Sequence, residues 1–179
     1  MASAARRPDP RPVSPAGLRR AGQTTCRPSS PVRTPWSPTD TRTVVDAAIR
    51  EAVVSARVGR LATVSGPGQP HVVPVCFALL EEVVYTAVDH KPKTTFRLRR
   101  ITNIEATGSA CLLVDGYDED WSNLWWVRLD GHGRVVRDRA EIGRAIGALV
   151  VKYAQYRQRP PAGPVLALDI TRWTAWSAR

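Results

Sequence analysis

The chain has 179 residues, which is long enough for one domain with a real hydrophobic core. Its 26 lysines and arginines outnumber its 16 aspartates and glutamates, for a net charge of +10. Residues 1–42 contain eight arginines and two aspartates and so carry +6 of this charge. The remainder is only mildly basic, which weakens the interpretation of the protein as a nucleic-acid binder.

Cysteine and histidine usage favours neither a disulfide framework nor a metal centre. The three cysteines form no C-x-x-C pair, and the three histidines are scattered without ligand spacing. A reducing cytoplasm is therefore the expected location. No apolar run approaches the roughly 18 residues of a membrane span.

Residues 1–38 differ in composition from the rest of the chain. They hold eight of the fifteen prolines, with arginine, serine and threonine and almost no large apolar residues. Such a segment cannot bury enough surface to fold, so we expect a disordered arm over residues 1–38 and one folded domain over residues 39–179. The arm has three open interpretations: a loose likeness to a transit peptide, a nucleic-acid-binding tail, or an over-extended start without function.

The first half of the folded domain reads as a helix followed by an antiparallel meander. Apolar residues recur at helical spacing over residues 41–57, and Gly59 ends that pattern. Three strands are then predicted, at residues 60–65, 70–79 and 83–88. Pro74 lies inside the second of these strands, and proline belongs at a sheet edge or bulge because it has no N–H to donate.

The stretch Tyr85–Ile104 carries the clearest chemical signal. A strand ends in the turn Asp89–Pro92, and a helix is predicted from Lys93 to Glu105, where Lys93, Arg97 and Arg100 would share one face. A helix start with added cations is suited to holding a phosphate. The alternative, a solvated basic helix that binds nothing, is equally compatible with this spacing.

The second half of the domain adds strands at residues 110–115, 124–130, 133–137 and 165–176, with a tight turn at Gly131–Gly133 and a helix over residues 138–153. About six main strands are expected in all. Closing that many short antiparallel strands into a small barrel removes exposed edges, so the predicted fold is mainly β, a β-barrel with flanking helices.

No obvious catalytic set accompanies this fold. The acidic residues between Asp115 and Ser122 read as a solvated loop, and Cys76 reads as a small core residue because no base is assigned to it. Trp125 and Trp126 point to opposite faces of a strand, so one of them at most lines a given pocket. If the protein is a catalyst, an organic cofactor is expected to carry the chemistry.

Three segments in succession resemble a known family: RLATVSGPGQPHVVPVCFAL, VYTAVDHKPKTTFRLRRITNI and ACLLVDGYDEDWSNLWWVRLDGHGRVV. They are similar to the pyridoxamine 5′-phosphate oxidase-like split-barrel superfamily, and most to its actinobacterial class that uses the deazaflavin coenzyme F420. The resemblance covers about residues 41–176 and implies a six-stranded antiparallel split barrel that forms a homodimer, with two cofactor sites at the dimer interface.

The resemblance also implies a cofactor site and a function. The backbone of Val73, Pro74 and Val75 would approach the cofactor ring, Trp125 or Trp126 would belong to the pocket, and the phosphate and acidic tail would be held by four further residues: Lys91, Lys93, Thr94 and Arg97. The expected activity is hydride transfer between coenzyme F420 and a small organic substrate, with no residue assigned as proton donor and no metal. The alternatives are an oxidase or reductase that uses flavin mononucleotide (FMN) and a non-catalytic protein that binds a cofactor or nucleic acid.

Overall fold

The computed structural model describes residues 46–89 and 98–178. Within these ranges the chain forms a seven-stranded antiparallel sheet in the order β2-β1-β5-β6-β7-β4-β3. The strands are β1 (Gly59–Val64), β2 (Pro70–Val75), β3 (Ala78–Leu80), β4 (Val83–Ala87), β5 (Ser109–Gly116), β6 (Trp125–Val135) and β7 (Val165–Ser177). The helices are α1 (Ala47–Ser55), α2 (Arg99–Thr107), the single turn η1 (Trp121–Asn123), α3 (Arg139–Lys152) and α4 (Ala154–Gln158).

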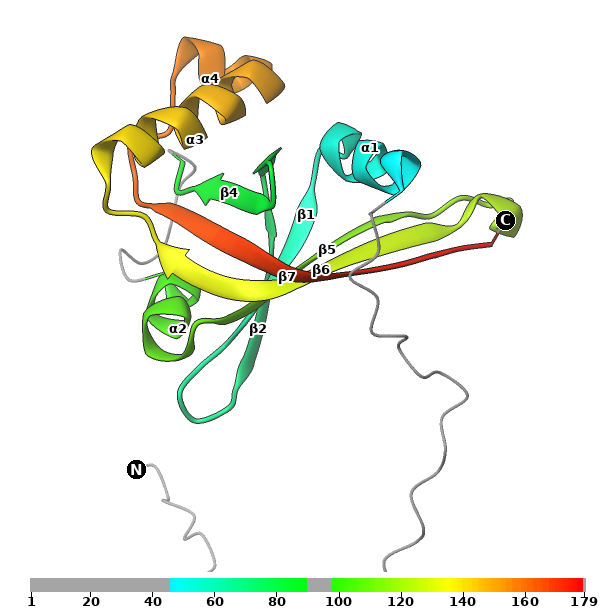
Figure 1. Cartoon of the computed structure of the whole chain (residues 1–179), viewed down its shortest axis with the longest axis horizontal. Helices are drawn as coiled ribbons and strands as arrows, with labels where there is room; N and C mark the ends of the chain where they lie inside the picture. The colour runs from blue at the N-terminus through cyan, green and yellow to red at the C-terminus, as the bar shows by residue number, and fades with distance from the viewer. Residues whose placement is uncertain (1–45, 90–97, 179) are drawn as a thin grey trace, which may run out of the picture. The chain divides into compact units, whose positions relative to one another are not determined.

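The two edge strands of this sheet, β2 and β3, are neighbours in sequence, joined only by Cys76 and Phe77. The sheet therefore curls until its two edges meet at this link, without a hydrogen-bonded ladder between them (Figure 1). This arrangement is a split barrel, which confirms the predicted fold class. The sheet has seven strands where about six main strands were expected: residues 70–79 form two strands rather than one, and the predicted strands 124–130 and 133–137 join into β6.

Tyr153 supplies the hydrogen bonds that the ladder lacks at this link. Its hydroxyl accepts the Phe77 N–H at 2.9 Å and lies 3.0 Å from the carbonyl oxygens of both Phe77 and Arg57, to one of which it donates. Phe77 is fully buried and Tyr153 is nearly so. One side chain from the end of α3 thus holds the β2–β3 link in place.

The barrel interior is filled by alternate residues of the strands. Leu61 of β1 lies opposite Val73 and Leu112, and Leu112 lies opposite Leu129 of β6, so these side chains share one face and form the main core. Ile104 of α2 packs into the same core. Two side-chain hydrogen bonds fix α2 on β1: Asn103 Nδ2 donates to Thr63 Oγ1 at 3.1 Å, and Thr107 Oγ1 lies 2.9 Å from the Val64 carbonyl oxygen.

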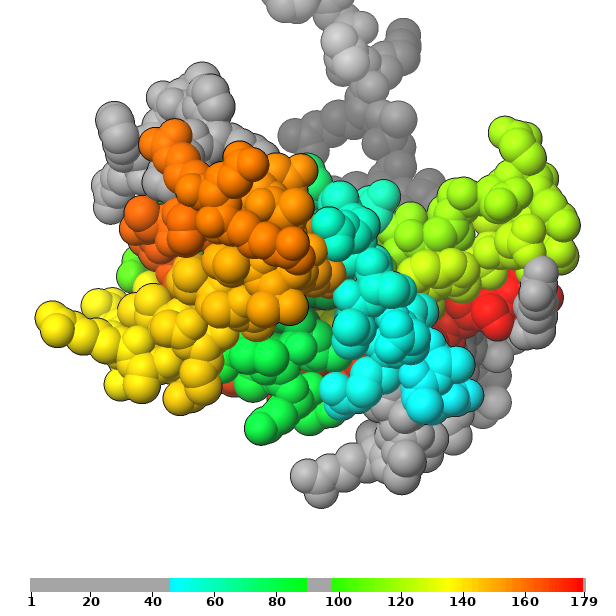
Figure 2. All heavy atoms as spheres, turned by 90° about the horizontal axis from the view of Figure 1, so that it is seen from above, coloured from blue at the N-terminus to red at the C-terminus, as the bar shows by residue number. Residues whose placement is uncertain are grey.

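On the side of β3 and β4, α3 and α4 cover the sheet (Figure 1). The α1 and α3–α4 segments meet on one face of the domain (Figure 2), where Arg57 Nη1 donates to the Lys152 carbonyl at 2.7 Å. In the same view the tip between β5 and β6, drawn yellow-green, stands apart from these helices. That tip exposes Tyr117 and Trp121.

Three local predictions differ from the structure. The predicted turn Gly131–Gly133 is absent, because β6 continues through a bulge at Asp130 and Gly131, where a Cβ on Gly131 would lie 2.1 Å from the Asp169 carbonyl oxygen. The first helix begins after Asp46, whose carboxylate caps it by accepting the Ala48 N–H at 3.0 Å. The short helix α4 was not predicted.

The third prediction that differs from the structure is the helix Lys93–Glu105. Leu98 is extended, with φ −77° and ψ 121°, and its carbonyl accepts the first helical hydrogen bonds, so α2 begins at Arg99. The predicted residues from Lys93 to Arg97 lie outside the described residues, so their place on a shared helix face stays a prediction.

Replacing Tyr153 with phenylalanine tests the role of its hydroxyl. The change leaves the buried Phe77 N–H without an acceptor, and we expect a loss of about 1–3 kcal/mol in the free energy of unfolding. Urea unfolding measures this loss, with Tyr117→Phe as the control because Tyr117 is 79% exposed. Equal stability of the two variants would show that the hydroxyl does not hold the link.

Candidate functional site

Strand β2 presents its backbone and both of its prolines to the outside. Val73 and Val75 face inward, the first packed against the main core and the second 8% exposed, whereas Pro74 is exposed. Because β2 is an edge strand, paired only with β1, one side of its backbone is open to another group. The sequence placed Pro74 at an edge or bulge, and the edge is confirmed.

The first turn of α2 lies beside β2. Arg99 and Arg100 begin this helix, its first turn contains no acidic residue, and Leu98 provides no side-chain cap. The pKa of His71 on β2 is lowered by burial and by the charges of these two arginines, and its Nδ1 is buried without a hydrogen-bond partner among the described residues. Two cations at the positive end of a helix repel the helix dipole, and an anion placed there would relieve that repulsion.

The other predicted anchors are Lys91, Lys93, Thr94 and Arg97, and they lie outside the described residues. Their assignment therefore stays a prediction. The described end of β4 and the described start of α2 bracket this segment, which joins Asp89 to Leu98. His71 was noted in the sequence only as a scattered histidine, since its position beside α2 depends on contacts distant in sequence.

The two neighbouring tryptophans separate as strand alternation requires. Trp125 turns inward: its indole lies over Gly116, where a Cβ would come within 2.3 Å of Trp125 Nε1, and it packs against the main core. Trp126 lies opposite Trp176 of β7, on the outer face. Trp126 thus shares its face with Pro74, while Trp125, the residue chosen from the sequence, belongs to the interior packing.

The cavity that the described residues form inside the barrel is too small for an organic ring. Its volume is about 10 Å³, and it lies between β1, β4, β5 and β7, lined by residues that include Leu61, Thr86 and Leu166. That volume is at the lower limit for one water molecule. A cofactor of flavin size does not fit in this cavity.

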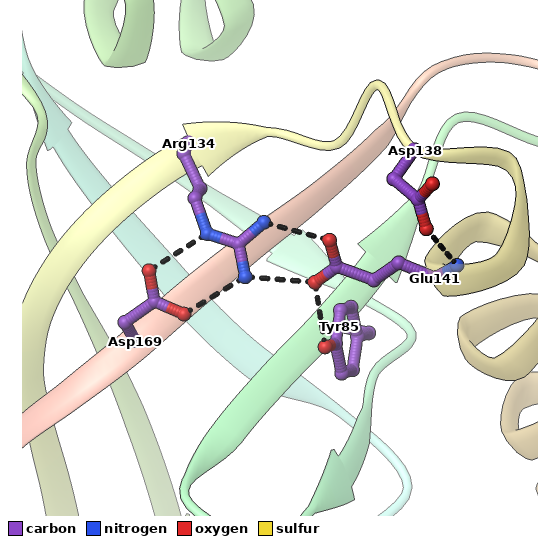
Figure 3. Close-up of polar contacts among 5 residues, drawn as sticks. All are labelled: Tyr85, Arg134, Asp138, Glu141 and Asp169. Atoms are coloured by element: carbon purple, nitrogen blue, oxygen red, sulfur yellow. Dashed lines mark hydrogen bonds and ion pairs between the residues drawn. The ribbon is translucent and has the colours of Figure 1, made fainter.

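A tyrosine, a glutamate and an arginine meet on β4, α3 and β6 and resemble an acid–base site (Figure 3). Arg134 donates two hydrogen bonds to Glu141, at 2.7 and 3.0 Å, and two to Asp169, at 2.8 and 3.0 Å, while the Tyr85 hydroxyl donates to Glu141 Oε1 at 2.8 Å. The hydrogen bonds from Arg134 lower the pKa of Glu141, and burial raises that of Tyr85. Each group is satisfied by the others, so this network fastens α3 to the sheet.

The acidic loop also has a structural explanation. Asp115 pairs with Arg60, and Asp120 Oδ1 accepts the Ser122 N–H at 3.0 Å, which caps η1. Hydrogen bonds from the Ser122 side chain and then from its N–H lower the pKa of Asp120. Across residues 46–89 and 98–178, no three His, Cys, Asp or Glu side chains gather closely enough to hold a metal ion. The helices of these ranges also include none that is long and apolar enough to cross a membrane.

Lys152, the last residue of α3, is an ionisable group that sequence reasoning missed. Its Nζ is buried, has no hydrogen-bond partner in the described part of the chain, and lies 3.9 Å from the centre of the Phe77 ring. Burial, and then the charge of Arg57, lower the pKa of Lys152 to about 8. The sequence shows only one lysine at the end of a helix, so nothing local marks it.

Comparisons with known proteins agree with this architecture. A family model described as pyridoxamine 5′-phosphate oxidase matches residues 45–177. No curated protein sequence matches the chain.

Solved structures share the fold at low sequence identity. A conserved hypothetical protein from Mycobacterium tuberculosis has a TM-score of 0.62 and 19% identity, over 76% of this chain and 87% of that one. An FAD-binding protein from Mesorhizobium loti has a TM-score of 0.55 and 20% identity, over 75% of this chain and 95% of that one. The heme storage protein of Vibrio cholerae has a TM-score of 0.57 and 14% identity, over 74% of this chain and 93% of that one.

The pKa of Lys152 leads to a prediction about stability and pH. Between about pH 8 and 10.5 the folded protein has lost the Lys152 proton that the unfolded chain still binds, so stability rises with pH in that window. Lys152→Met removes this contribution. Urea unfolding at pH 7 and pH 10 should show that the wild type gains stability relative to the variant at the higher pH. An unchanged difference between the two pH values would contradict the assignment.

Proposed function

Because the chain belongs to the pyridoxamine 5′-phosphate oxidase family, we propose that it is a cytoplasmic oxidoreductase that binds the deazaflavin coenzyme F420. It transfers a hydride between the coenzyme ring and a small organic substrate. A redox cofactor of flavin type fits the fold, since one of its structural neighbours is an FAD-binding protein. The choice of F420 rests on the sequence resemblance.

The observation that carries the proposal is the open edge of β2. The side chains of Val73 and Val75 pack inward, so the outside of this strand offers a ring its backbone groups together with exposed apolar side chains, Pro74 and Val72 among them. A planar ring with polar atoms on its rim is well suited to such an edge, because the unpaired strand groups give it hydrogen bonds. The filled interior leaves the outside as the place for that ring.

The cationic start of α2 supports the position of the acidic tail. His71 to Val75 spans roughly 13 Å along an extended strand, which separates a ring at one end of β2 from an anion at the other. Arg99 and Arg100 provide charge near His71. Lys91, Lys93, Thr94 and Arg97 complete the proposed anchor.

When bound, the coenzyme supplies the hydride-transfer chemistry. The protein's own residues hold and orient it: the β2 backbone positions the ring, and the cations hold the tail. Trp125 supports this arrangement from the core. No described side chain is assigned as a proton donor.

A homodimer is part of the proposal, and the outer face of the sheet is the surface we assign to it. Val72 is 59% exposed and Trp176 is 47% exposed, while Pro74, Leu113 and Trp126 add further apolar area on the same face. These apolar side chains lie among the charged residues Arg60, Asp115 and Arg128 of the same face, and their exposure supports an association surface there. Because Pro74 lies within it, the two cofactor sites would form where the subunits meet.

Two other functions remain candidates. An FMN-dependent oxidase or reductase would use the same β2 edge and the same cationic anchor. A non-catalytic carrier is the second, since the structural neighbour from Vibrio cholerae is a heme storage protein. Nucleic-acid binding through the basic arm is the interpretation that the mild charge of the folded domain disfavours.

Fluorescence titration of the purified full chain with F420 and FMN, and absorbance titration with hemin, tests the cofactor. We expect F420 to bind most tightly, and we expect Lys93→Ala combined with Arg97→Ala to weaken that binding at least about tenfold, since each charged contact contributes about 1.5–3 kcal/mol. Arg144→Ala on α3 is the control because it removes an exposed arginine from another element. It should leave binding unchanged.

Other outcomes of that titration select other functions. A yellow protein that retains FMN would show that FMN, and not F420, is the cofactor that binds at this site. A heme absorbance band without binding of either flavin would favour a carrier. Binding to none of the three, with DNA binding that falls steeply with salt, would overturn the proposal.

The dimer surface has its own test. Light scattering on a size-exclusion column should give twice the mass of one chain for the wild type. Val72→Asp combined with Trp176→Asp should give a single chain, because two carboxylates would be buried in the interface. Val151→Asp is the matched control, since Val151 is 75% exposed on α3. A monomeric wild type, or a dimeric double variant, would contradict the assignment.

A further inference from the structure

Arg60 of β1 lies beside the part of β2 to which the proposed function assigns the coenzyme ring. It is the register partner of Pro74, and side chains directly opposite each other on one face of a sheet have Cβ atoms roughly 5 Å apart. Both residues are exposed on the outer face. A positive charge therefore lies next to the ring site, whereas the proposed place of the acidic tail is near His71, toward the other end of β2.

Asp115 of β5 holds the Arg60 guanidinium in place. Arg60 Nη1 donates to Asp115 Oδ1, and the side chains of Arg60 and Asp115 are 47% and 15% exposed, respectively. The carboxylate is thus largely covered by its surroundings, whereas much of the arginine faces solvent. Asp115 therefore fixes the position of the guanidinium and leaves part of it open to a ligand.

Arg134 is an example in the same chain of an arginine that binds two carboxylates at once (Figure 3). Its guanidinium donates two hydrogen bonds to Glu141 and two to Asp169. In the described part of the chain, the Arg60 guanidinium donates one hydrogen bond, to Asp115. A guanidinium has five N–H donors, so Arg60 retains enough of them for a second carboxylate.

The ion pairs of the outer face also favour an anion there. Three arginines of this face pair with two aspartates: Arg60 with Asp115, and Arg128 and Arg172 with Asp130. This group carries one more positive than negative charge, and Arg128 lies in the same cross-strand row as Arg60. A ligand carboxylate beside Arg60 would neutralise that excess.

We propose that Arg60 binds the carboxylate of the organic substrate and thereby orients that substrate against the coenzyme ring. The inference rests on the proposed function and narrows its substrate to an organic acid. An arginine and a carboxylate form two parallel N–H···O bonds in one plane, so the contact fixes a direction as well as a position. The carbon that gains or loses the hydride is then held at the ring, which lowers the entropy cost of the reaction.

NMR titration of the complex between the full chain and F420 tests this inference. The probes are acetate, benzoate and naphthoate, each compared with its own primary amide, which keeps the shape and lacks the charge. At least one acid should bind about tenfold more tightly than its amide, and Arg60→Gln should remove that difference. Arg60→Lys should restore part of it, because lysine keeps the charge but lacks the planar fork of donors.

Arg172→Gln is the matched control. The Arg172 side chain is also 47% exposed and also pairs with an aspartate of the outer face, but it lies on β7, three strands from β1 in the sheet order. This variant should leave the preference for the acid unchanged. Arg60→Gln should have the same mass as the wild type by light scattering and the same affinity for F420.

The remaining outcomes contradict the inference. Equal binding of acid and amide by the wild type, or an acid preference that survives in Arg60→Gln, would show that Arg60 does not bind the substrate. A weaker affinity of that variant for F420 would place the coenzyme's acidic tail at Arg60, and a smaller mass would place Arg60 in the subunit contact. A wild type that does not bind F420 would overturn the proposed function itself, so the titration distinguishes the two failures.

Discussion

The link of Cys76 and Phe77 is the constraint on which the rest of the structure depends. Two residues join the first and last strands of the sheet order, so the barrel is closed by the chain itself and not by a β ladder. The backbone groups at this gap need other partners, and the Tyr153 hydroxyl provides one for Phe77. Because Tyr153 ends α3, the helix and the closure of the sheet depend on each other.

The open edge that results gives the protein its candidate site. A continuous ladder from β2 to β3 would occupy the backbone of Val73, Pro74 and Val75 and leave nothing for a ligand. The split leaves β2 paired on one side only, while its side chains still complete the core. Arg99 and Arg100 at the start of α2 lie near His71, at the opposite end of β2 from Val75. The cofactor ring and its anionic tail would therefore bind at opposite ends of this strand.

Much of this fold follows from local sequence pattern, since alternating apolar residues marked β1, β4, β5 and β7 within one or two residues. Pro74 identified an edge because its chemistry is local. The break at Phe77 was not predictable in this way, since its hydrogen-bond partner lies 76 positions away. Gly131 suggested a turn, but a glycine is needed there because the Asp169 carbonyl lies too close for a side chain. That contact is likewise distant in sequence.

In the candidate site, too, some features follow from local sequence pattern and others depend on contacts distant in sequence. The inward position of Val73 and Val75 follows from strand alternation, and so does the separation of Trp125 from Trp126. The burial of His71 and Lys152 depends on helices that pack from distant parts of the sequence. No residue pattern near His71 or Lys152 indicates that its side-chain nitrogen is buried.

A crystal structure of the protein with bound F420 tests the central claim most directly. We expect the ring to contact the Val73–Val75 backbone on the outside of the barrel and the acidic tail to run toward the start of α2. A ring bound against α3 and α4, or a tail directed away from Arg99 and Arg100, would contradict it.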